Sequence, residues 1–230
     1  MVEFAEERSE CYVVQGAEVE PYLAKMGISV PEIVDALAAG ELAAGNTTRF
    51  APRTAAGLKR WLSVVERARE GLAVANGWTL EDKLNRPTSV SPDKKYSLAF
   101  VGGNEDTGVA SGTPKAARKR GRATAEDYPQ SDTEIRYGAQ VFSMFSAERS
   151  VSSGGVDTGV TPPLGAWVLL YYRDEDELRW EISLPTAFSS QDKQFSGWYV
   201  RIIGPEALKG ELLQKDVPDV GGGDVDFEIA

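Results

Sequence analysis

The segment from residue 166 to residue 203 constrains the fold more than any other part of the chain. Its first run, AWVLLYYR (166–173), is apolar on both faces, which is typical of a central strand covered on both sides. A second strand is predicted over Leu178–Leu184, where apolar and polar residues alternate so that one face is apolar. We expect Pro185 to end it, and a third strand follows over 197–203. The three strands predict an antiparallel meander.

Helical signals occupy residues 21–77. A short helix is predicted to end near Gly27, and a second is predicted to begin at Val30-Pro31. The clearest helix runs from Thr54, its expected N-cap, to Asn76-Gly77. Because these helices can cover one face of the sheet, the predicted class is α+β, with N-terminal helices packed on a mainly antiparallel sheet.

The remaining segments predict shorter strands, long irregular loops and a disordered C-terminal tail. A hairpin is predicted over 88–101, an edge strand near 11–15 and a further strand within 135–145. Residues 102–135 are rich in Gly, Ser, Thr, Pro and charge, so we expect a long mobile loop there.

The chain is thereby divided into three parts. A helical N-terminal region spans 1–77, and a β-rich region of the same domain spans 78–210. An acidic, flexible tail spans 211–230.

The residue inventory removes several kinds of chemistry. The chain has no histidine and one cysteine, Cys11, which excludes His-dependent nucleophile activation, imidazole or thiolate zinc sites and CxxC redox motifs. No Walker A pattern occurs, and the Gly221–Gly223 triplet lies in the tail. We therefore expect no catalytic residues, no cofactor and no bound metal ion.

Two carboxylate hypotheses are weaker alternatives. The tetrapeptide Asp-Thr-Gly-Val occurs at Asp106 and at Asp157, and Asp-Thr-Gly resembles the aspartic-protease signature. The flanking residues are typical of turns, so two turns are the favoured interpretation. A metal-dependent hydrolase or nuclease could use Asp93 with Glu177 or Glu181, but the expected acid-x-Lys pattern is absent.

Charge is distributed unevenly. The net charge is −10, yet the run KAARKRGR (115–122) holds five cations, Lys115, Arg118, Lys119, Arg120 and Arg122. Without them the rest of the chain carries −15 (−10 minus 5), which indicates a basic island on an acidic body. An alternative function is therefore nucleic-acid binding by this basic loop.

The tail suggests a protein partner. Val225, Phe227 and Ile229 alternate with acidic residues, a pattern that suits addition of a strand to the edge of a partner's sheet. No run reaches the length of about 20 apolar residues that spans a bilayer, and the first ten residues are acidic. We expect a cytoplasmic protein with no membrane contact.

Four short motifs carry a resemblance: Gly77-Trp78, Ser91-Pro92-Asp93, WEISLP (180–185) and Gly197-Trp198. Their layout resembles bacterial proteins encoded on plasmids and genomic islands, a group without an established activity. The resemblance therefore favours no enzymatic activity. The leading prediction, a non-catalytic interaction protein that is an accessory or defence-related subunit of a bacterial complex, follows from the lack of catalytic constellations, the acidic body and the tail segment Val225–Ile229.

Overall fold

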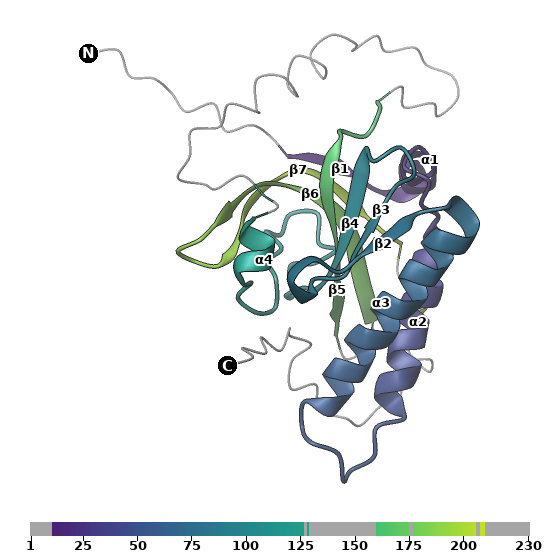
Figure 1. Cartoon of the computed structure of the whole chain (residues 1–230), viewed down its shortest axis with the longest axis vertical. Coiled ribbons are helices and arrows are strands. Elements are labelled where there is room, and N and C mark those ends of the chain that lie inside the picture. Colours follow the sequence, from purple (N-terminus) through teal and green to yellow (C-terminus); the bar gives the residue numbers. More distant parts are fainter. Residues whose placement is uncertain (1–10, 127, 129–159, 175–176, 206–207, 210–230) are drawn as a thin grey trace.

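The computed structural model describes residues 11–126, 128, 160–174, 177–205 and 208–209, and its fold is α+β as the sequence predicts. Three N-terminal helices pack against a mixed, mostly antiparallel sheet (Figure 1). The helices are α1 (Val19–Ala24), α2 (Val30–Gly45), α3 (Ala55–Asn76) and the short α4 (Arg122–Ala125), with 3-10 turns η1 (Gly16–Glu18) and η2 (Lys83–Asn85). The strands are β1 (Tyr12–Val14), β2 (Thr79–Glu81), β3 (Thr88–Val90), β4 (Tyr96–Gly102), β5 (Gly165–Arg173), β6 (Glu177–Ser189), β7 (Gln194–Ile203) and β8 (Leu208–Lys209).

The sheet has the strand order β1-β7-β6-β5-β4-β3-β2, and β8 pairs with β6 beside this path. β5 lies in the middle, which confirms the prediction drawn from its two apolar faces. The meander β5-β6-β7 and the hairpin β3-β4 are antiparallel as predicted, whereas β1 with β7 and β4 with β5 are parallel pairs. Because β4 and β5 are parallel neighbours, the chain after β4 must return to the level at which β4 begins before it enters β5.

Local signals set the ends of the two long helices. Ser29 and Glu32 form a reciprocal capping box at the start of α2, and Pro31 occupies its first turn. α3 ends where Gly77 adopts the left-handed conformation, with φ of 67°. Thr54 occupies the N-cap position of α3 as expected, but its backbone is helical and its side chain makes no capping hydrogen bond.

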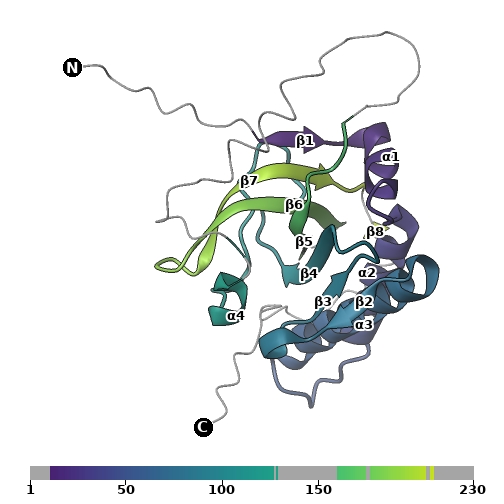
Figure 2. The ribbon, with the colours of Figure 1, turned by 45° about the horizontal axis from the view of Figure 1, so that its top comes forward.

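The helices cover one face of the sheet and form the main core with it (Figure 2). Alternate residues of β5 and β6 point to this face, so the strand period predicted from the sequence holds. The largest fully buried side chains of this core are Trp167 and Trp180 from the sheet and Tyr22, Ile33, Leu37 and Leu72 from the helices.

Pro185 does not end β6, contrary to the prediction. The strand continues to Ser189 because its pairing with β7 shifts register at Leu184/Pro185, Pro185/Ala187 and Ala187/Phe188. Such irregularities let a strand carry a proline, which cannot donate a ladder hydrogen bond, and they bend the strand. The bent end of the β6–β7 hairpin brings Phe188 and Phe195 into a second core cluster on the opposite face of the sheet.

The loop after β4 covers this second face, so the expectation of a mobile loop is wrong for residues 103–120. Thr107 is fully buried, and Ala116 and Arg120 are 4% and 6% exposed. The indole N–H of Trp198 donates to the Pro114 carbonyl (3.1 Å), and Ala116 N–H donates to the Gln194 side chain (3.1 Å). The predicted strand within 135–145, the second Asp-Thr-Gly-Val from 157 to 159 and the tail from 211 lie outside the described residues.

Candidate functional site

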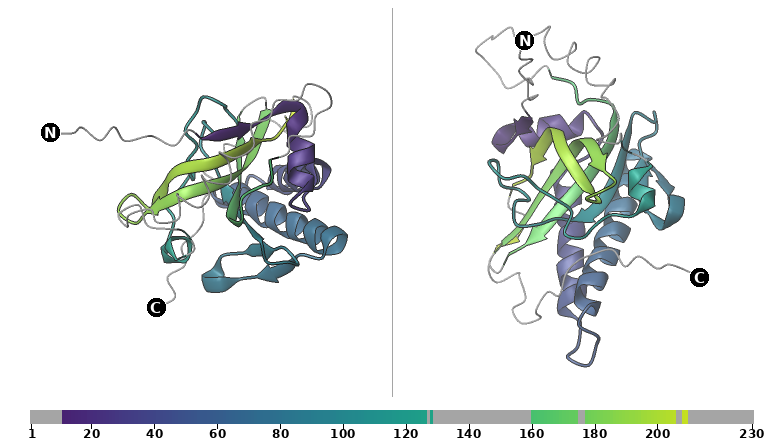
Figure 3. Two further views of the ribbon diagram at one scale, coloured as in Figure 1. Left: turned by 90° about the horizontal axis from the view of Figure 1, so that it is seen from above. Right: turned by 90° about the vertical axis from the view of Figure 1, so that its left-hand side faces the viewer.

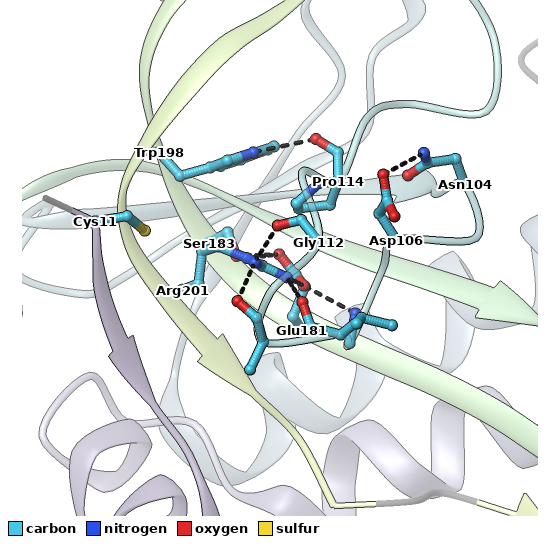
Figure 4. A network of polar contacts seen from close by, with 12 residues as sticks. Cys11, Asn104, Asp106, Gly112, Pro114, Glu181, Ser183, Trp198 and Arg201 are labelled. Carbon is cyan, nitrogen blue, oxygen red and sulfur yellow. Dashed lines mark hydrogen bonds and ion pairs between the residues drawn. The ribbon is translucent and has the colours of Figure 1, made fainter. Parts of the chain in front are cut away.

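A buried ion pair lies between the sheet and the loop that covers its second face (Figure 4). Glu181 on β6 is 0% exposed and Arg201 on β7 is 3% exposed. The guanidinium donates to both carboxylate oxygens, from Nε to Oε1 at 3.1 Å and from Nη2 to Oε2 at 2.6 Å. Its other three N–H groups donate to the carbonyls of Val109 (2.9 Å), Ala110 (3.3 Å) and Gly112 (2.8 Å).

The hydrogen-bonding capacity of this pair is fully used. An arginine has five N–H donors, and the five contacts of Arg201 account for all of them. The Glu181 carboxylate also accepts from the Ser183 hydroxyl (2.7 Å) and from the backbone N–H of Gly108 (2.9 Å). Neither the guanidinium of Arg201 nor the carboxylate of Glu181 retains hydrogen-bonding capacity for a substrate, so this pair serves to fasten the loop to the sheet.

The first Asp-Thr-Gly-Val is part of this fastening. Gly108 has φ of +75°, and a Cβ there would lie 2.9 Å from Cβ of Arg179, so only glycine fits. The Val109 N–H donates to the Asp106 carbonyl (3.1 Å), which closes the turn. The sequence interpretation of this copy as a turn is thus confirmed, and Asp157 of the second copy lies outside the described residues.

The three carboxylates weighed as metal ligands are separated. Asp93 accepts from Ser91 Oγ (2.8 Å) and from Lys95 N–H (3.1 Å) and so stabilises its own turn. Glu177 pairs with Arg179 (3.0 Å) at the start of β6, and Glu181 is buried as described above. Among the residues that the structure describes, no group of three or more His, Cys, Asp or Glu side chains is placed to hold a metal ion.

The predicted basic island is only partly at the surface. Lys115, Lys119 and Arg122 are exposed, Arg118 is half-buried and Arg120 is buried. Arg122 donates to Glu126 one helical turn later (2.8 Å). Arg120 is therefore part of the fold, and three of the five predicted cations remain at the surface.

Two further exposed cations lie next to the island, although they are far away in the sequence. Lys83 of η2 pairs with Glu126 (3.5 Å), the same carboxylate that Arg122 contacts. The carbonyl of Lys193, in the β6–β7 turn, accepts from the N–H of Arg120 (2.8 Å). We call the exposed set the basic face: Lys83, Lys115, Lys119, Arg122 and Lys193.

The described residues are not acidic, although the chain as a whole is. They hold 21 Lys and Arg against 17 Asp and Glu, which gives +4 (21 minus 17). The chain as a whole carries −10, so the other segments carry −14 (−10 minus 4). The described residues thus carry a small positive net charge, and the acidic excess of the chain belongs to the other segments.

Sequence reasoning missed a second basic surface, at the turn between α2 and α3. Arg49, Arg53 and Lys59 are exposed there beside Phe50, which is 83% exposed. The available signal was an absence of acids, since no Asp or Glu occurs from residue 42 to residue 65. That signal is weak by itself, because the helical period of α3 does not show that the start of this helix projects from the sheet.

A shallow groove of about 410 Å³ also runs along the α2–α3 pair. Leu42 and Asn46 line it from α2, and Glu66, Arg67 and Glu70 line it from α3. Arg67 pairs with Asp35 and Glu70, so its charge is compensated, and much of the remaining lining is apolar.

Comparisons with protein-family models, with curated proteins and with solved structures find no match to this chain. No helix among the described residues has the length and apolarity needed to cross a bilayer.

Proposed function

We propose that this chain is a non-catalytic interaction protein that serves as an accessory subunit of a complex. The observation that supports this function best is the state of the two buried carboxylates in the described part of the chain. Glu181 is saturated by Arg201, Ser183 and Gly108, and Glu41 is held by two arginines. Catalytic acids and bases are groups that face a substrate, and these two face only the protein's own side chains and backbone.

The pair around Glu41 illustrates this structural use of charge. Arg60 of α3 donates to Glu41 of α2 through Nε and Nη2, and Arg173 at the end of β5 contacts it from the sheet (3.1 Å). Glu41 and Arg60 are 7% and 6% exposed. The cluster ties two helices to the central strand, so its charges hold the fold together.

A protein partner is the proposed ligand of the tail. Its apolar residues Val225, Phe227 and Ile229 alternate with acids, so one face of an added strand would be apolar and the other charged. The test is affinity purification from the native cell after nuclease treatment. A variant with aspartate at all three apolar positions should lose the recovered partner, whereas the control D226N/E228Q, which leaves the apolar face intact, should retain it. Equal recovery by both variants would refute the proposal.

A nucleic acid is the second candidate ligand, and the convergence of Lys83 and Lys193 on the predicted island favours it. Exposed cations from separate segments can follow a phosphate backbone, and each phosphate contact makes binding more sensitive to salt. Replacing Lys115, Lys119 and Arg122 with glutamine should reduce the slope of log K against log salt by about 2 to 3 for duplex DNA, at about 0.9 per phosphate. Arg120 is left in place because it is buried. An unchanged slope would remove the basic face as the binding surface.

A further inference from the structure

The α2–α3 hairpin projects from the sheet, and its connecting turn lies at the far end (Figures 1 and 3). Its inner part is fixed to the body. Ile33 and Leu37 of α2 and Leu72 of α3 belong to the main core, and the indole N–H of Trp61 donates to the Phe100 carbonyl (3.3 Å). The cluster of Glu41 with arginines of α3 and β5 marks the outer limit of this attachment. We call residues 42–59, beyond that limit, the arm.

The turn of the arm is ordered by its own hydrogen bonds. Thr47 N–H donates to the Ala44 carbonyl (3.0 Å), and Ala51 N–H donates to the Thr48 carbonyl (3.0 Å). The Ala55 N–H then donates to the Pro52 carbonyl (2.9 Å) and leads into α3. A turn held in this way loses little conformational entropy when a ligand binds.

The charge of the arm has one sign. Arg49, Arg53 and Lys59 are exposed, and none of them lies within salt-bridge distance of a carboxylate among the described residues. Acids reappear on α3 only at Glu66 and Glu70, on the inner side of the attachment. Among the residues that the structure describes, the tip thus carries only positive charge, and its complement is an anionic ligand.

The tip also exposes an aromatic ring between its two arginines. Phe50 is 83% exposed, and the guanidinium of Arg49 lies 4.8 Å from its ring centroid. The arginine stacks on the ring and leaves the remaining surface of Phe50 to solvent. A ring flanked by cations is the arrangement that binds single-stranded nucleic acids, in which bases stack on aromatic side chains while cations contact the phosphates.

We propose that the tip of the arm is a binding site for single-stranded nucleic acid, with Phe50 stacked on a base and Arg49 and Arg53 on the adjoining phosphates. The carboxylates of an acidic protein segment would pair with the arginines without stacking on the ring, whereas every nucleotide supplies a phosphate together with a base. The site uses none of the residues of the basic face or of the tail. It adds a ligand class to the proposed interaction protein and does not depend on the tail's partner.

The experiment uses the full chain and fluorescence anisotropy of labelled single-stranded DNA and RNA oligonucleotides at several salt concentrations. Phe50→Ala should weaken binding roughly 5- to 150-fold, the range that corresponds to the loss of one base–aromatic stack. The control Leu80→Ala removes an exposed apolar side chain elsewhere (54% exposed) and should bind like the wild type. The double variant R49Q/R53Q should reduce the salt slope by about 1.4, at about 0.7 per phosphate of a single strand.

Oligonucleotides containing 2-aminopurine test the stack itself. Binding should quench their fluorescence in the wild type, and Phe50→Ala should abolish the quenching even at saturating protein. Binding of DNA and RNA with equal affinity supports a stacking and phosphate contact, because neither depends on the sugar hydroxyl.

Four results would overturn the proposal. The first is no retention of either oligonucleotide by the wild type at low salt. The second is Phe50→Ala with wild-type affinity, and the third is equal competition by a polyglutamate peptide, which would indicate an acidic protein ligand. Loss of binding in the basic-face variant alone, with the Phe50 and arginine variants unaffected, would place the nucleic acid on the basic face and reject the arm. Circular dichroism melting of each variant checks that the fold is unchanged.

Discussion

Arg201→Met is expected to destabilise the fold strongly because it leaves a charge buried without its partner. Glu181 is 0% exposed and would lose two of its four hydrogen-bond donors, and the loop carbonyls at Val109, Ala110 and Gly112 would lose theirs. Removing one member of a buried ion pair costs about 3–5 kcal/mol. Since domains of this kind have unfolding free energies of about 5–15 kcal/mol, this loss is a large fraction of the total.

The assay is equilibrium unfolding in urea, followed by the fluorescence of the chain's five tryptophans. The double variant E181L/R201M removes both charges, so it should be more stable than R201M alone although only one residue differs between them. The matched control is Arg122→Met. Its side chain is 88% exposed and pairs with Glu126 on the surface, so its unfolding free energy should change by no more than about 0.5 kcal/mol.

Two outcomes would contradict this reasoning. If the unfolding free energy of R201M lay within about 1 kcal/mol of the wild-type value, water would have to reach Glu181. The loop would then not seal the second face of the sheet. A double variant less stable than R201M would mean that the hydrogen bonds from Ser183 and Gly108 to Glu181 stabilise the fold by more than the unpaired carboxylate destabilises it.

Three further predictions concern single positions. Gly108→Ala should destabilise the fold by about 1–3 kcal/mol in the same urea assay, because φ is positive and a Cβ would collide with β6. The control Gly16→Ala, at a position with positive φ but open space, should lower the unfolding free energy by less. The hydrogen bond from Ser91 helps to lower the pKa of Asp93 from its ordinary 3.8 to about 2, so this carboxylate stabilises the fold above pH 3.8 and loses its effect as the pH falls towards about 2. The stability difference between wild type and Asp93→Asn should shrink over that window, and a difference independent of pH would be inconsistent with the shift. Burial raises the pKa of the Cys11 thiol, so iodoacetamide should alkylate the folded chain more slowly than the urea-unfolded chain at mildly alkaline pH, with mass spectrometry as the readout.

The helices and the central strand could be predicted because their determinants are local. The capping box at Ser29 and Glu32 lies within one turn, and the left-handed Gly77 terminates α3 through contacts with the preceding turn. The two apolar faces of residues 166–173 identify β5 as the middle strand without reference to any other segment. Periods of two and of about 3.6 residues are properties of a short window, so one sequence suffices to find them.

The candidate surfaces depended on tertiary contacts. Lys83 and Lys193 approach the predicted island from separate segments, and the projection of Phe50 and its arginines follows from where the sheet stops supporting α2 and α3. The sequence did mark residues 115–122 as basic, but it could not show that Arg120 is buried. Exposure of a cation depends on what packs around it, and composition does not record that.

The sequence alone determined which segments are helices and strands and which face of each strand is apolar, because these follow from short-range periodicity and capping. Only the tertiary structure decided that the polar face of β6 is also covered. Arg201 meets Glu181 20 residues away and the Val109 carbonyl 92 residues away. The same Glu-x-Ser pattern would be a solvated face if residues 103–120 did not lie on it, since a polar residue can be buried wherever distant groups complete its hydrogen bonds.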